Sequence, residues 1–148
     1  MQISGIKDED FKFSNLSPFI NLVFSYSISG HSDLKVGYKG FYFKYILDDI
    51  NHKYHFIYIS FSLNILDYFC TTFLENRFNS KFYLGSGIFH NYHKDKTQFC
   101  IDIGGQLNYQ LVKNLFLNFD ISSIAGWKIY QDNYDILPAL SIGLTKKI

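Results

Sequence analysis

A long run of alternating apolar and polar residues, from Thr97 to Gly126, constrains the fold of this chain more than any other feature. Between Phe99 and Leu111, every second residue is apolar, aromatic or glycine, and the residues between them are mostly polar or small. This period of two predicts a β-strand with two chemically opposite faces. The strand is longer than the five or six residues that are usual in soluble domains. Its apolar face points either into a core or into lipid, and the rest of the chain has to decide.

Similar alternation divides the chain into eight segments. The second is less regular around Gly40, and the fourth is the shortest and weakest. An even number of antiparallel strands is typical of bacterial membrane barrels. The pattern predicts an all-β fold, an eight-stranded antiparallel up-and-down transmembrane β-barrel. Its strands are expected at about 16–29, 34–47, 54–65, 68–75, 82–91, 99–111, 115–127 and 136–146.

The connections between these segments differ in length. The shortest is VKN at 112–114, whereas HNYHKDK at 90–96 and KIYQDNYD at 128–135 are longer. In an eight-stranded arrangement VKN falls at one rim and the two longer connections fall at the other. Short connections on the inner side of the membrane and long ones outside are usual in membrane barrels.

The composition limits the classes of protein that fit. The chain has 148 residues, which suits one domain spanning 1–148. Its formal net charge is +1, so nothing electrostatic favours a nucleic acid partner. Aromatic residues make up 20% of the chain and charged residues only 18%, below the roughly 25% of typical soluble domains. The mean hydropathy of −0.03 suits a barrel in which lipid-facing and interior residues cancel.

The polar faces of the last three segments carry mostly glycine, serine, asparagine, glutamine and threonine, and the charged residues concentrate in the connections. A sheet surface that faces water carries more lysine and glutamate, so this distribution favours a barrel interior. Asp102 and Asp120 are then expected to point inward and to need partners there, because an unpaired buried carboxylate is costly. Lys39 or Lys44 of the second segment supplies such a partner. A soluble lipocalin-like barrel that binds an apolar ligand remains the alternative fold.

The N-terminus and the two cysteines give weaker indications. Residues 1–15, MQISGIKDEDFKFSN, lack the apolar stretch of a secretory signal peptide and are expected to form an N-terminal extension. Cys70 and Cys100 fit no metal-binding spacing. They are expected to be either two small apolar strand residues or a disulfide.

The last half of the chain resembles the small outer-membrane β-barrels of Gram-negative bacteria, of the OmpA and surface-antigen type. The resemblance rests on FYLGSGIF at 82–89 and on FCIDIGGQLNYQLVKNLFLNFDIS at 99–122. It implies a membrane barrel in the bacterial outer membrane, in contact with outer-membrane lipids or lipopolysaccharide. It is specific for the fold and says little about activity.

A narrower resemblance connects ISSIAGWK at 121–128 with the lipid A 3-O-deacylase barrels, whose motif is His–x–Ser–Asn followed by Ala–Gly. It implies Ser123 as the candidate nucleophile. However, Ile121 stands at the histidine position and Ile124 at the asparagine position. A serine without an adjacent base is a poor nucleophile. We therefore expect no histidine within hydrogen-bond reach, about 3 Å, of Ser122 or Ser123.

The sequence thus favours an outer-membrane protein with a structural or surface role over an enzyme, and it indicates no cofactor. A lipid A-modifying hydrolase with a degenerate motif remains an alternative function. His90 and His93 have a spacing that two metal ligands can use, but in a polar connection this spacing is more often solvated, so no metal site is expected.

Overall fold

The structure of the protein, a computed structural model, describes residues 17–44, 50–64, 77–129 and 133–146. Seven strands form one sheet, and each strand is antiparallel to the next along the chain. Within the described residues no helix has the length and hydrophobicity needed to cross a membrane. The strands are β1 (Phe19–Ser29), β2 (Ser32–Lys44), β3 (Asn51–Asn64), β4 (Phe78–Asn91), β5 (Lys96–Val112), β6 (Leu115–Trp127) and β7 (Tyr134–Lys146).

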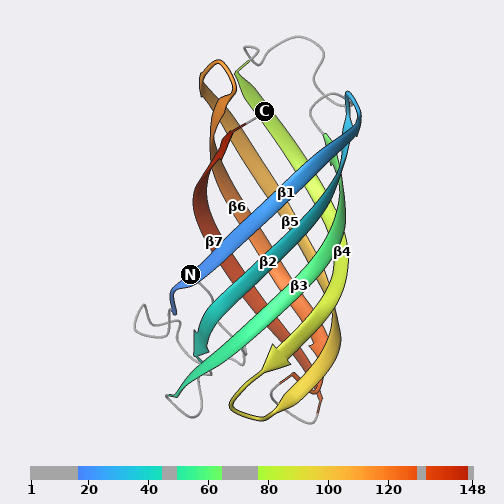
Figure 1. The fold of residues 1–148 in the computed structure, drawn as a ribbon, viewed down its shortest axis with the longest axis vertical. Coiled ribbons are helices and arrows are strands. Elements are labelled where there is room, and N and C mark those ends of the chain that lie inside the picture. The colour runs from blue at the N-terminus through green and yellow to red at the C-terminus, as the bar shows by residue number, and fades with distance from the viewer. Residues whose placement is uncertain (1–16, 45–49, 65–76, 130–132, 147–148) are drawn as a thin grey trace.

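The sheet curls around its own long axis. Strands β1 to β3 form the near wall in Figure 1, β5 to β7 form the far wall, and β4 connects the two walls at one side. Among the described residues, β1 and β7 are edge strands, and no ladder joins them. The expected closed barrel of eight strands is therefore wrong, and the observed fold is an open half-barrel of seven strands.

The strand count differs from the expectation between β3 and β4. The expected fourth strand, 68–75, lies outside the described residues. β3 nevertheless pairs directly with β4, from Tyr54 opposite Asn91 to Asn64 opposite Lys81, so no strand lies between them. Gly87 helps this contact, because a Cβ atom at its position would lie 2.1 Å from the carbonyl oxygen of Ile57. The two strands fit each other closely, and an intervening strand would have to break that fit.

The alternation of the sequence corresponds to the two faces of the sheet. In β3, for example, each buried residue from His52 to Asn64 is preceded by a more exposed one. The convex outer face carries large apolar side chains that no described residue covers. The concave inner face carries most of the buried polar residues. The irregularity expected around Gly40 causes no shift in register, since pairing continues from Gly40 with His55 to Phe41 with Tyr54. Phe41 does adopt a positive φ of 110°, a backbone conformation that is rare for a bulky residue.

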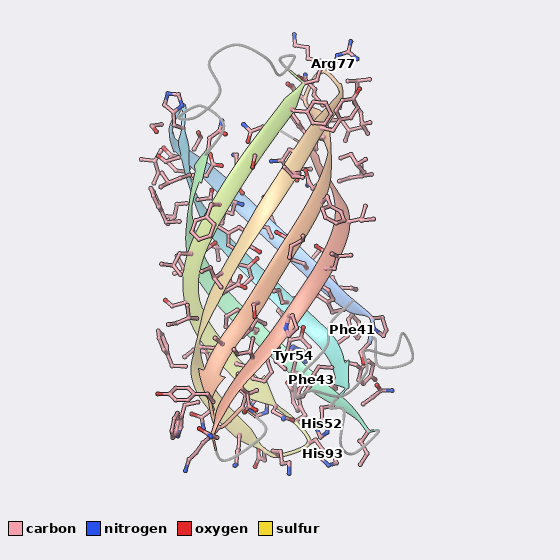
Figure 2. All side chains as sticks on the ribbon, turned by 180° about the vertical axis from the view of Figure 1, so that it is seen from behind. Phe41, Phe43, His52, Tyr54, Arg77 and His93 are labelled. Carbon is pink, nitrogen blue, oxygen red and sulfur yellow. The ribbon has the colours of Figure 1, made fainter. Side chains whose placement is uncertain are left out.

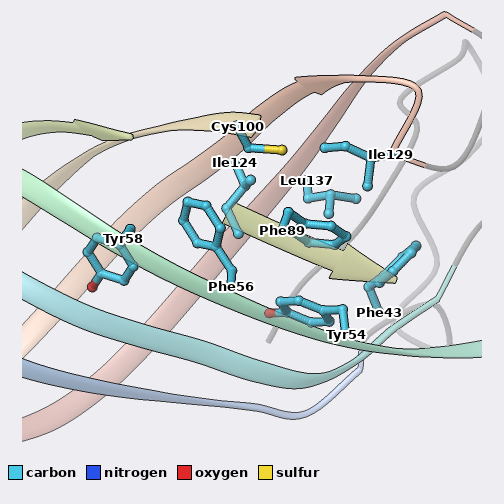
Figure 3. Packing of buried hydrophobic residues seen from close by; sticks show 9 residues of the cluster. All are labelled: Phe43, Tyr54, Phe56, Tyr58, Phe89, Cys100, Ile124, Ile129 and Leu137. Carbon is cyan, nitrogen blue, oxygen red and sulfur yellow. The ribbon is translucent and has the colours of Figure 1, made fainter. Parts of the chain in front are cut away.

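One end of the interior is filled by a cluster of buried aromatic and aliphatic residues (Figure 3). Its rings are in stacked, tilted or edge-on contact, and those of Tyr54 and Phe89, for example, are stacked with centroids 5.0 Å apart. Because the members come from β2 to β7, the cluster holds the two walls of the half-barrel together at this end. They are Phe43, Tyr54, Phe56, Tyr58, Phe89, Cys100, Ile124, Ile129 and Leu137.

The two ends of the sheet carry different connections. The two-residue turn of Lys113 and Asn114 lies at one end. The turn at 92–95 lies at the other end, where β6 also ends at Trp127 and β7 begins at Tyr134, as expected. Asn114 has a φ of 66°, which asparagine tolerates better than most residues. β3 ends at Asn64 and β4 begins at Phe78 at the same end of the sheet as this short turn. In Figure 2, Arg77 accordingly lies far from His52 and His93. Connection lengths therefore do not distinguish the two sides of the sheet.

Candidate functional site

A buried lysine–aspartate pair crosses the middle of the interior. Lys39 of β2 donates from Nζ to both carboxylate oxygens of Asp102 on β5, at 2.7 and 2.8 Å. It also donates to Oγ of Ser122 on β6, at 3.1 Å. Lys39 and Asp102 have relative exposures of 1% and 0%. The inward orientation of Asp102 and its pairing with Lys39 are confirmed, whereas the side chain of Lys44, the other expected partner, lies outside what the structure describes.

Further charged and polar groups continue this interior away from the aromatic cluster. Lys35 donates to Oε1 of Gln106 at 2.8 Å, and its Nζ lies 4.9 Å from the ring centroid of Tyr83. Lys81 of β4 forms an ion pair with Asp33 of β2. We call the set of inward groups Asp33, Lys35, Lys39, Lys81, Asp102, Gln106, Asp120 and Ser122 the polar interior.

Two tyrosines of the interior each reach over a glycine of the adjacent strand and form a hydrogen bond with the strand beyond it. Tyr58 of β3 lies over Gly37 of β2 and donates to Oδ1 of Asn21 on β1, at 3.1 Å. Tyr83 of β4 lies over Gly104 of β5 and donates to Oδ1 of Asp120 on β6, at 3.2 Å. In each case the glycine leaves room for the ring to reach across the strand next to its own. The expected partner of Asp120 therefore exists, but it is a phenol and not a lysine.

The hydrogen bonds of Lys39 connect opposite walls of the half-barrel. The three hydrogen bonds of Lys39 use all the donors of its ammonium group. Ser122 is 4% exposed, and its hydroxyl oxygen accepts a hydrogen bond from Nζ of Lys39. The arrangement connects β2 with β5 and β6.

Ser123, the candidate nucleophile of the deacylase resemblance, points to the other face. It lies on the outer side of β6, opposite Ile103 on β5 and Pro138 on β7. Its hydroxyl oxygen is covered and has no hydrogen-bond partner among the described residues. On β5, Ile103 is six residues from Thr97, which faces His90, so that histidine is roughly 20 Å away along the strand. Among the residues that the structure describes, the motif is not assembled around Ser123.

The structure separates the two histidines of the HNYHKDK connection. His90 lies on the outer face of β4, with Nδ1 2.8 Å from Oγ1 of Thr97. His93 packs edge-on against the buried ring of His52, with centroids 4.6 Å apart. Within the described residues, no group of three or more histidine, cysteine, aspartate or glutamate side chains could hold a metal ion. Cys100 is buried as a free thiol, and both Cys70 and the expected extension 1–15 lie outside the described residues.

Several site residues were not identified from the sequence. Lys35 and Asp33 share the inner face of β2 with Lys39, and the period of two could have shown this. Lys81 was missed because β4 begins at Phe78, before the predicted start of that strand at 82. The contacts made by Tyr58 and Tyr83 depend on the neighbouring strands, which a single sequence does not specify.

Comparisons with known proteins leave the family of the chain open. No family model, no curated protein and no solved structure matches this chain.

Proposed function

We propose that this chain is a membrane-embedded β-sheet of the barrel type, with a structural or surface role in a bacterial outer membrane and with outer-membrane lipids or lipopolysaccharide around it. The observation that carries the proposal is the apolar outer face. It includes Ile57 of β3, Ile103 of β5 and Ile142 of β7, which are 61%, 41% and 72% exposed. Exposed apolar surface that extends over a whole sheet is not stable in water and indicates a lipid or protein partner.

The polarity of the two faces supports lipid as that partner. Charged pairs such as Lys39 with Asp102 are inside, and aliphatic side chains are outside. This is the distribution of membrane barrels, in which outward residues are apolar and interior residues are polar. A soluble barrel that binds an apolar ligand has the opposite distribution. The packed polar interior favours a structural role, because small barrels are filled by side chains and have no aqueous channel.

The dimensions of the outer face also support the proposal. The strands contain 11 to 17 residues, and a tilted transmembrane strand needs about 9 to 11. Aromatic pairs lie near both ends of the apolar band. The ring centroids of Trp127 and Tyr134 are 4.3 Å apart at one end, and those of Phe78 and Tyr109 are 4.8 Å apart at the other. Aromatic girdles at the two interfaces are a feature of membrane barrels.

Insertion adds a requirement at the free edges of β1 and β7. Lipid cannot hydrogen-bond to backbone N–H and C=O groups, so these edges must be paired within a bilayer. With seven antiparallel strands, β1 and β7 run in the same direction. One further strand antiparallel to both would satisfy the two edges.

The depth of the single tryptophan in a bilayer tests the proposal. The protein is reconstituted into phosphatidylcholine vesicles that carry bromine either near the headgroups or deep in the acyl chains. We expect Trp127 fluorescence to be quenched more by the shallow bromine. In a Trp127→Phe, Ile103→Trp variant, we expect stronger quenching by the deep bromine.

A matched control places the tryptophan in the turn between β5 and β6. The Trp127→Phe, Lys113→Trp variant should show little quenching by the deep bromine, because Lys113 lies beyond the apolar band. If Ile103→Trp is quenched no more than Lys113→Trp while circular dichroism shows folded β-sheet, the sheet does not enter the bilayer and the proposal fails.

A further inference from the structure

A cluster of imidazole, phenol and ammonium groups lies on the outer face, at the end of the sheet that carries the turn 92–95. Its residues come from four neighbouring strands and that turn. In the pairing register, His55 lies opposite His90, and His90 lies opposite Thr97. We call this cluster the imidazole patch, defined as Tyr38, Lys53, His55, His90, Tyr92 and Thr97.

Contacts within the patch hold the two imidazole rings in place. The phenol oxygen of Tyr38 lies 2.7 Å from Nδ1 of His55. Gly40 allows this contact, because a Cβ atom there would lie 2.3 Å from that oxygen. Nδ1 of His90 lies 2.8 Å from Oγ1 of Thr97. Both histidines therefore use Nδ1 within the sheet.

Tyr92 joins the two histidines and adds a cation. Its ring packs edge-on against His55 and His90, with centroids 4.9 and 4.4 Å apart. Nζ of Lys53 lies 5.3 Å from the same ring. The backbone N–H of Tyr92 donates to the carbonyl oxygen of Lys53 at 3.0 Å, which fixes the turn against β3. Tyr92 is 52% exposed, so this part of the patch is accessible.

The remaining donors of the patch suit an anion. No hydrogen bond from a described residue reaches Nε2 of His55 or His90. When a hydroxyl donates to Nδ1, the proton of the neutral ring lies on Nε2 and can be donated outward. Lys53 adds a positive charge, and none of the six residues is acidic. Two N–H donors beside an ammonium group match the oxygens of a phosphate.

We propose that the imidazole patch binds the phosphate of a membrane lipid headgroup. The proposal rests on the proposed insertion of the sheet. The surface beside the patch favours a lipid over a free anion. The neighbouring residues on the outer face, Ile57, Ile88 and Phe99, are exposed and apolar. A phosphate held by the patch would thus have its acyl chains along the aliphatic band, as in a leaflet whose headgroups lie at this level.

Titration with a short-chain lipid tests this site. The full chain is folded in maltoside detergent, which has no phosphate, and titrated with dihexanoyl phosphatidic acid while the histidine ring signals are followed by NMR. We expect the signals of His55 and His90 to shift and that of His31, in the turn at the opposite end, to stay unchanged. Inorganic phosphate should bind at least about tenfold more weakly, and dihexanoylglycerol should shift neither signal.

Matched variants identify the donors. His55→Gln with His90→Gln, and separately Lys53→Gln, should each weaken phosphatidic acid binding about tenfold, the loss expected from one charge-assisted hydrogen bond. His31→Gln and Lys113→Gln, at the other end of the sheet, should bind like the unchanged protein. Lys53 is exposed, so its variant keeps the test valid if the histidine pair is needed for folding.

The outcomes separate this proposal from that of insertion. Unchanged affinity in both patch variants, or equal affinity for inorganic phosphate, would overturn the lipid site even where Trp127 quenching shows insertion. Absence of depth-dependent quenching with normal phosphatidic acid binding would instead overturn the insertion and leave a headgroup-binding surface.

Discussion

At the scale of single residues, Lys39 and Asp102 form a buried ion pair in which each charge compensates the other. Lys39→Met leaves the carboxylate of Asp102 buried without its cation. Removal of one partner of a buried pair typically costs about 3–5 kcal/mol. We expect a loss of that size in the free energy of unfolding, measured by urea titration of the protein in vesicles with Trp127 fluorescence.

The double variant is the control for this prediction. Lys39→Met with Asp102→Leu removes both charges, and such replacements are often neutral or stabilising. We therefore expect the double variant to be more stable than Lys39→Met alone. If both variants lose the same free energy, the pair makes no such compensation and the interior tolerates the free carboxylate.

Two adjacent glycines of β5 give a second prediction at this scale. A Cβ atom on Gly104 would lie 2.5 Å from the phenol oxygen of Tyr83 and 2.7 Å from the carbonyl oxygen of Ile121. Gly104→Ala should therefore lower the free energy of unfolding by about 1–3 kcal/mol, since overpacking has this cost. Gly105 points outward and has nothing within 4 Å of such an atom, so Gly105→Ala should be tolerated. Equal effects in urea titrations would mean that the two faces of β5 are assigned wrongly.

At the scale of the strand, the outer face of β5 predicts a gradient of stability. Ile103→Arg, near the middle of the strand, should cost about 2–4 kcal/mol in vesicles, whereas Leu111→Arg near its end should cost about 0–1 kcal/mol. The inward Asn108→Ser change should be mild. The comparison is made by urea unfolding of each variant in the same lipid. Equal, small costs at positions 103 and 111 would indicate that the outer face of β5 is in water.

At the scale of the whole molecule, the open edges predict selective changes in hydrogen exchange. Amides on the free sides of β1 and β7 have no ladder partner among the described residues and should exchange quickly in detergent. In vesicles these same amides should become protected, because lipid requires the edges to be paired. β4 and β5, which are paired on both sides, should change little. Free-side amides that exchange equally fast in vesicles and detergent would show that the edges stay in water.

Alternation in the sequence predicted the strands and their faces well. β6 has the expected bounds, Leu115–Trp127, and Asp102 and Asp120 point inward as expected. The reason is that a period of two is a local property of an extended chain, which each strand expresses by itself. The extent of β4 was harder to predict, since FNSK before position 82 combines apolar and polar residues without clear alternation.

The candidate site was predictable only in part. Asp102 needed a cation from β2, and of the two lysines considered the structure selects Lys39. That selection depends on how far the sheet curls, which no local pattern encodes. The imidazole patch combines residues from Tyr38 to Thr97, and only the registers of three strand pairs bring them together.

The sequence by itself therefore determined that this chain forms long amphipathic strands with a polar face and an apolar face, because side-chain direction alternates along any strand. Only the tertiary structure decided how many strands the sheet has, which strands are neighbours and whether it closes. β3 pairs with β4 across the segment where a further strand was expected, and β1 and β7 are left as edges. Strand neighbours are set by complementary packing between distant segments, such as Gly87 against the backbone of Ile57, and this information exists only once the strands are side by side.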